Sequence, residues 1–223
     1  LYFTGTPTFV IAIGAMFSAL EVVPLALIGV EAYKNYQRSK AAAWVQAYKW
    51  SILCFIAVGF WNVVGAGLLG FAINTPIALY YMQGLNMTAA HGHAALFGVY
   101  GMLGIGLLLF CLRGLSDRAA WSDKLLAPMF WSLNIGLAMM VFISLVPAGI
   151  YQAWASITQG MWFARSPEVI HSNLMETFVW MRVPGDIVFA IGCVFLALFA
   201  WRLLMGGKRE QSALTPTAQT KRV

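Results

Sequence analysis

The sequence predicts an all-α integral membrane protein with five spanning helices. Of its 223 residues, 61% are hydrophobic and 10% are charged, whereas a soluble domain of this length carries about 25% charged residues. Five apolar stretches are each long enough, at about 1.5 Å per helical residue, to cross about 30 Å of hydrocarbon. The sequence lacks the alternating segments of about ten residues that are typical of outer-membrane barrels.

The first two predicted helices cover about 8–33 and 47–73. Pro7 stands where helices favour a proline, at the start of the first, and Pro24 should kink that helix. The second contains four glycines, which allow neighbouring helices to approach closely. These are Gly59, Gly65, Gly67 and Gly70.

The other three predicted helices cover about 88–112, 126–150 and 183–206, and the connection 151–182 is expected to be partly helical. Pro184 near the start of the fifth helix marks a kink or a boundary. The sequence after 206 is polar and short of large apolar side chains, which is typical of disordered segments. We therefore predict one transmembrane domain over 1–206 and a disordered cytoplasmic tail over 207–223.

The formal net charge of +6 is distributed as a topology signal. Twelve of the 14 Lys and Arg residues lie in or beside alternate connections and at or after the end of the fifth helix, and the other two are Arg165 and Arg182. The twelve are Lys34, Arg38, Lys40, Lys49, Arg113, Arg118, Lys124, Arg202, Lys208, Arg209, Lys221 and Arg222. Because positive residues mark the cytoplasmic side, the first helix starts outside and the C-terminus is cytoplasmic. This charge pattern gives no reason to expect a nucleic-acid partner.

Two histidines two residues apart, His91 and His93, lie in the outer third of the third helix. Residues two apart on a helix project about 200° from one another, so these imidazoles leave on opposite faces and cannot chelate one metal. They can serve two different centres, one on each side of the helix. Intramembrane ionisable groups are costly and usually functional, although two hydrogen-bonded core histidines remain the alternative.

The run Ala90–Met102, AHGHAALFGVYGM, resembles the haem-bearing helix of nitric oxide reductases in the haem–copper oxidase superfamily. The resemblance extends over nearly the whole chain, and is closest to the quinol-dependent single-chain form. It implies that the five helices form the C-terminal part of a twelve-helix core. It also implies that His91 binds the iron of the high-spin, active-site haem b, and His93 that of the low-spin haem b.

Glu21 lies near the middle of the first helix, in the run FSALEVVP. A carboxyl group in the membrane must be neutral or paired, because desolvation penalises its charged form. The family places a glutamate that faces the active site in this motif, where many oxidases carry a proton-conducting lysine. The resemblance therefore predicts a catalytic role for Glu21, and a structural carboxyl bonded to a neighbouring helix is the alternative.

Arg182 and Asp186 open the fifth helix on the predicted outer side. Haem propionates point outward in this superfamily, and an arginine can bind a carboxylate with two hydrogen bonds. We predict that Arg182 clamps a propionate and that Asp186 orients Arg182. The alternative is an interfacial arginine that extends toward the headgroups. His171, in the outer connection, has no predicted role.

The resemblance implies a nitric oxide reductase of the bacterial inner membrane that converts two NO to N2O and water at a haem b/non-haem iron centre. Quinol is the expected electron donor, and membrane lipid surrounds the helices. The ligands of the non-haem iron would lie outside this chain, on earlier helices of the same polypeptide, so the chain alone would be incomplete. A homodimer is compatible with this form. The alternatives are an oxygen-reducing oxidase and a non-enzymatic di-haem electron-transfer protein.

Overall fold

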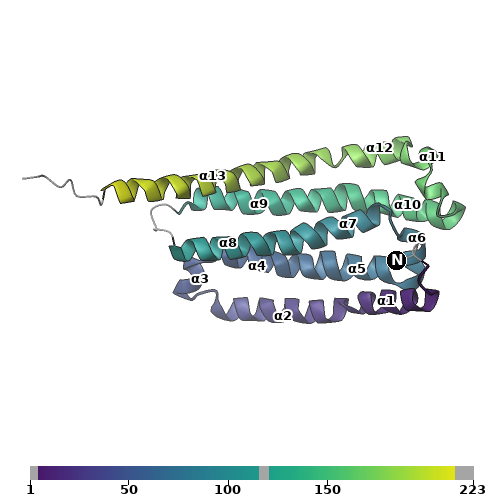
Figure 1. Ribbon diagram of the computed structural model, residues 1–223, viewed down its shortest axis with the longest axis horizontal. Coiled ribbons are helices and arrows are strands. Elements are labelled where there is room, and N and C mark those ends of the chain that lie inside the picture. Colours follow the sequence, from purple (N-terminus) through teal and green to yellow (C-terminus); the bar gives the residue numbers. More distant parts are fainter. Residues whose placement is uncertain (1–4, 116–120, 214–223) are drawn as a thin grey trace, which may run out of the picture.

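A computed structural model describes residues 5–115 and 121–213, in which five antiparallel spans pack side by side in the order of the sequence (Figure 1). The spans are Thr8–Ser39, Lys49–Asn74, Asn86–Leu115, Asp123–Gln159 and Asn173–Met205. Each is long and apolar enough to cross a membrane. The described part of the chain contains helices and no strands, which confirms the predicted all-α membrane fold class.

Most spans are built from more than one helical segment. The first two comprise α1 (Thr8–Leu20), α2 (Val22–Ser39), α4 (Lys49–Trp61), the π-helix η1 (Asn62–Leu69) and α5 (Gly70–Asn74). The third and fourth comprise α7 (Asn86–Ala95), π-helix η2 (Leu96–Gly101), α8 (Met102–Leu115), α9 (Asp123–Met139), π-helix η3 (Met140–Leu145) and α10 (Val146–Gln159). The fifth comprises α12 (Asn173–Trp180) and α13 (Val183–Ala213). The connections contain α3 (Ala43–Ala47), α6 (Pro76–Met82), η4 (Phe163–Arg165) and α11 (Pro167–Ile170).

Several helices extend beyond the boundaries predicted from the apolar runs. The first span continues to Ser39 and the fourth to Gln159, because an apolar run reports the thickness of the hydrocarbon and not the point where a helix ends. The fourth helix ends at Gly160, whose φ of 103° is accessible mainly to glycine. α13 continues to Ala213, so the first residues of the predicted disordered tail are helical, and 214–223 lie outside the described residues.

The first span breaks at Glu21, three residues before Pro24, where we predicted the kink. Pro24 has no N–H group, and its ring would clash with the carbonyl of Leu20 in a regular helix. The helix is irregular just before the proline, where the backbone N–H of Glu21 donates to the carbonyl of Ser18, three residues earlier, at 3.3 Å. The break therefore separates α1 from α2 at the residue that carries the carboxyl group.

Glycines set the contact between the fourth and fifth spans. A Cβ atom on Gly136 would lie 2.5 Å from the Phe189 backbone nitrogen, and one on Gly185 would lie 2.9 Å from that of Met140. Only glycine permits such an approach, so the backbones of α9 and α13 meet directly. This packing fixes the fifth span, which carries Arg182 between α12 and α13, against the rest of the bundle.

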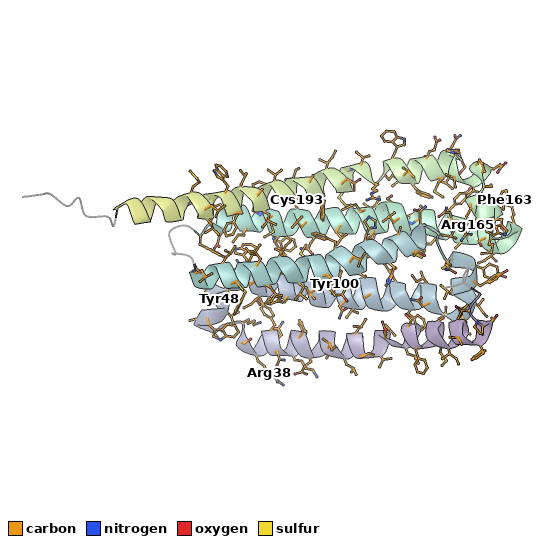
Figure 2. The ribbon with its side chains drawn as sticks, viewed as in Figure 1. Arg38, Tyr48, Tyr100, Phe163, Arg165 and Cys193 are labelled. Carbon is orange, nitrogen blue, oxygen red and sulfur yellow. The ribbon has the colours of Figure 1, made fainter. Side chains whose placement is uncertain are left out.

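The two ends of the bundle carry different residues. Figure 2 shows Phe163 and Arg165 together at one end, beside α6 and α11, and Tyr48 at the opposite end. We call the Arg165 end the outer end, following the charge distribution. Arg118, Lys221 and Arg222, which contributed to that assignment, lie outside the described residues.

The predicted orientation can be measured with Gln37 and Gln159, which are exposed at opposite ends of the bundle. We expect a cysteine at Gln159 to react with a membrane-impermeant maleimide in intact spheroplasts. A cysteine at Gln37 should react only after permeabilisation, because positive connections stay in the cytoplasm. Accessible native cysteines are replaced first. Labelling of both positions from the same side would contradict the topology.

Candidate functional site

The two histidines of α7 face different neighbouring spans. The Nδ1 atom of His91 lies 2.9 Å from the carbonyl oxygen of Gly65 in the second span. The Nε2 atom of His93 lies 3.1 Å from Nη2 of Arg182 in the fifth span. The imidazoles therefore leave the helix on opposite sides, as the spacing predicted, and each ring is partly buried between helices.

The contact with Gly65 fixes the proton position on His91. A carbonyl oxygen can only accept, so the Nδ1–H group of His91 donates, and Nε2 is the nitrogen left to act as a ligand. Gly65 belongs to the π-helix η1, and a Cβ atom there would lie 2.6 Å from the Cβ of Ala94. A glycine is thus required for the second span to come close enough to α7 to offer this carbonyl.

Gly70 makes room for the His91 ring. A Cβ atom on Gly70 would lie 3.1 Å from Cε1 and 3.5 Å from Nδ1 of His91. The first distance is tighter than an ordinary van der Waals contact, so even an alanine would press on the imidazole. Gly65 orients the ring by a hydrogen bond, and Gly70 leaves space for it beside the second span.

His93 is held from both of its nitrogens. Its Nδ1–H group donates to the carbonyl of Ala89 at 2.8 Å, and its Nε2 accepts from Arg182. The Nε atom of Arg182 in turn lies 3.2 Å from Oδ1 of Asp186, in an ion pair four residues apart. Arg182, Asp186 and His93 thus form one connected polar group at the outer end of the bundle.

A cavity of about 150 Å³ brings Glu21 and His91 together, although they are 70 positions apart. Its lining residues are Ser18, Glu21, Asn62, Ala66, Gly70, Asn74, His91, Ala95, Val99 and Tyr100. Figure 2 shows Tyr100 about midway along the length of the bundle, and the residue is 67% exposed. More than half of these residues carry polar side chains, which is unusual inside apolar spans and indicates a functional cavity.

Sequence reasoning assigned none of four polar lining residues to a site: Ser18, Asn62, Asn74 and Tyr100. The asparagines were the available signal, because an uncompensated amide is costly in a membrane. The residue that sequence reasoning left without a role, His171, is exposed in the turn between α11 and α12 and does not line the cavity. Within residues 5–115 and 121–213, no three His, Cys, Asp or Glu side chains group to hold a metal ion.

The histidines suit axial ligation of haem iron. The Nδ1–H group of each histidine donates to a backbone carbonyl. This hydrogen bond fixes the ring orientation and leaves Nε2 as the nitrogen that can bind a metal. The Nε2 lone pair of His93 is directed toward the fifth span, where it accepts a hydrogen bond from Arg182 that a bound iron would replace. The donor set therefore fits one axial haem ligand on each side of the helix.

A second hollow lies at the outer end of the fifth span. This groove, of about 590 Å³, is lined by Asn173, Glu176, Thr177, Trp180, Met181 and Pro184. It combines carboxylate and amide groups with an aromatic ring that is 73% exposed, that of Trp180. Such a surface suits a molecule that is polar at one end and apolar at the other.

Comparison with known proteins places these features in a family. Residues 1–188 match the family model of cytochrome c and quinol oxidase polypeptide I. The chain is also 29% identical, over 203 residues, to one of the subunits of nitric oxide reductase from Stutzerimonas stutzeri. That alignment covers 86% of this chain and 40% of the relative, so the chain spans about two fifths of the relative's length. With most of its length matched by the family model, the chain belongs to the cytochrome c and quinol oxidase polypeptide I family.

Proposed function

We propose that this chain is part of a membrane-bound nitric oxide reductase. The reaction joins two NO molecules, with two electrons and two protons, to give N2O and H2O. The observation that carries the proposal is the shared cavity of Glu21 and His91, which places a carboxyl group beside a candidate iron ligand. The likeness to the nitric oxide reductase of Stutzerimonas stutzeri supports the choice of substrate.

In this proposal His91 binds the iron of the high-spin haem b, and His93 binds that of the low-spin haem b. When bound, the two haems supply the electron transfer and the iron chemistry. The chain's own residues orient the ligands, through the Gly65 and Ala89 carbonyls. A non-haem iron completes the centre, with ligands on helices outside this chain.

Arg182 and Asp186 are proposed to bind the haem propionates, Arg182 directly and Asp186 as its partner. The guanidinium lies 3.1 Å from the Nε2 atom of His93. When that atom binds the haem iron, Arg182 would exchange this hydrogen bond for one to a propionate of the same haem. The side chains of Arg182 and Asp186 are 36% and 46% exposed, which leaves the guanidinium donors room to bind a carboxylate. Their ion pair keeps the positive charge beside the site.

Glu21 is proposed to hold a proton at its carboxyl group and to release it into the cavity during turnover. A positioned carboxyl group can transfer a proton over hydrogen-bond distance or through one water molecule. The cavity is lined by other polar side chains at different depths, including those of Asn62 and Asn74. These side chains would keep water in place between Glu21 and the reacting atoms.

Quinol is proposed as the electron donor, and the groove beside Trp180 is where it would bind. Met181 and Pro184 line this groove, and Arg182 between them contacts His93. A donor in the groove would therefore lie near the ligand of the low-spin haem. The aromatic ring of Trp180 would cover the apolar part of the quinol, and Glu176 would accept a hydrogen bond from a hydroxyl group.

The setting proposed for the protein is the bacterial inner membrane, with the C-terminus in the cytoplasm. In this proposal the five spans pack against earlier helices of the same polypeptide, and two copies of the full-length protein form a homodimer. The cavity and groove take part in the reaction only in that larger core, since Glu21 is exposed on this chain alone. A catalytic carboxyl group needs the pocket to be closed around it.

An oxygen-reducing oxidase is the rival function within the family. Glu21, in place of the proton-conducting lysine of many oxidases, favours NO, as does the relative. The test uses the full-length protein, purified with its haems and supplied with a reduced quinol or with reduced cytochrome c. We expect NO consumption with stoichiometric N2O, faster with quinol. Oxygen consumption without NO consumption would overturn the proposal, and NO consumption with cytochrome c alone would overturn quinol as the donor.

A further inference from the structure

The first turn of α7 is held by a side chain from another span. α7 begins at Asn86, and no side chain of the residue before it, Leu85, caps the helix. The backbone N–H and the Nδ2 group of Asn86 both donate to Oε1 of Gln152 in α10, each at 2.9 Å. Gln152 therefore takes the place of a helix cap for the helix that carries His91 and His93.

Gln152 is itself fixed. It is 7% exposed, and its Nε2 group donates to the carbonyl oxygen of Ala164 in η4 at 3.5 Å. Arg165, which follows Ala164 in the chain, donates to the carbonyl oxygens of Gln83 and Met161. The chain that enters α7 and the chain that leaves α10 are thus joined by one polar network at the outer end.

The distance and the rotation of α7 are set by different contacts. One turn before Gln152, a Cβ atom on Gly149 would lie 2.4 Å from the backbone nitrogen of Met87. This close contact determines how near α10 and α7 come, but a smooth backbone surface does not prevent α7 from turning about its own axis. The two hydrogen bonds from Asn86 to a single oxygen do prevent it, because they require one orientation of the first turn.

Rotation matters because the ligands lie far from the helix axis. His91 and His93 follow Asn86 by five and seven residues, or about 7.5 and 10.5 Å along the helix. An imidazole Nε2 lies about 6 Å from the axis, so a rotation of about 10° moves it by about 1 Å. A displacement of that size exceeds the tolerance of about 0.5 Å for a functional group in its productive geometry.

We propose that Gln152 is a positioning residue, which sets the rotational register of α7 and so aims both histidines at their irons. The inference rests on the proposed function, in which His91 and His93 are the haem ligands. It predicts that loss of the Gln152 amide changes the electronic signature of the haems before it changes how much haem is bound. A glutamine that merely fills space would affect stability without that signature.

The test is the full-length holoenzyme with Gln152→Met, which keeps a long unbranched side chain and removes both hydrogen bonds. Gln159→Met, on the exposed end of the same helix, is the matched control. We expect Gln152→Met to shift and broaden the low-spin haem signal in electron paramagnetic resonance and to slow NO turnover roughly tenfold. Gln159→Met should leave both unchanged. In its neutral form, Gln152→Glu keeps both hydrogen bonds and should restore the wild-type signal.

Asn86→Ala provides a second measurement if Gln152→Met does not fold. It removes the Nδ2 donor and keeps the backbone donor, so a smaller shift of the same signal is expected. A wild-type signal in a folded Gln152→Met or Asn86→Ala protein, or an equal shift in Gln159→Met, would overturn the positioning role and leave the proposed function intact. A low-spin signal that stays the same in the His93→Ala variant as in the wild type would instead overturn the ligand assignment on which the inference rests.

Discussion

Replacing His93 by alanine in the full-length protein is expected to remove the low-spin haem while the high-spin haem stays bound. His93 leaves α7 toward the fifth span, and its Nε2 atom is the basic nitrogen on that side of the helix. We expect NO turnover to fall by more than about a hundredfold. Losing a ligand should cost more than losing its hydrogen-bond partner, which typically costs 10–100-fold.

The matching change, His91→Ala, is expected to have the reverse spectral effect. His91 faces the second span and the cavity that contains Glu21, so its loss should remove the high-spin haem and retain the low-spin one. His171→Ala is the control, because that histidine is exposed in a turn and lies outside the cavity lining. The measurements are haem content, visible spectra and electron paramagnetic resonance of the purified variants.

The pair of variants separates two interpretations of the His91–His93 motif. If both histidines were only hydrogen-bonded core residues, each change would lower the stability of the protein. The haem spectra of the two variants would then match that of the wild type. An unchanged haem spectrum in either variant would rule out ligation by that residue. Loss of both haems from both variants would be resolved by adding imidazole, which can replace the missing ring only at a true ligand position.

The sequence predicted the spans because apolar composition over 20 or more residues has one physical solution in a membrane, the helix. It could not predict where helices end beyond the hydrocarbon, and the extension of the fourth span to Gln159 is an example. It also misplaced the break in the first span. A proline removes a hydrogen bond and displaces the preceding turn, so the irregular residue is Glu21 and not Pro24 itself.

The opposite faces of His91 and His93 followed from helix geometry alone, since two residues always differ by about 200°. The neighbours of those faces did not, because contacts between distant residues depend on how the spans pack. The Gly65 carbonyl, the cavity shared with Glu21 and the anchor at Gln152 all join residues at least 26 positions apart. None of these contacts leaves a local pattern in the sequence.

Glu21→Gln is expected to slow NO turnover by about 10²–10⁴-fold, the usual effect of removing a general acid or base, while both haems remain bound. The side-chain amide has nearly the same shape as the carboxyl group, so it should preserve the cavity but cannot release a proton in turnover. The measurement is the steady-state rate of NO consumption, together with haem content and spectra of the same preparation.

The control for this change is Glu31→Gln, ten residues further along the same span and exposed on α2, away from the cavity. It makes the same exchange of carboxyl for amide in the same span without touching the cavity lining, and it should keep the wild-type rate. Glu21→Asp retains an acid with a shorter reach, so an intermediate rate is expected if proton transfer depends on position. If Glu21→Gln consumes NO at the wild-type rate at neutral pH, the carboxyl group is structural. Proton delivery would then have to depend on Tyr100 or on groups outside this chain. Of the other polar lining residues, His91 is the proposed iron ligand, and the serine and the two asparagines are not acids.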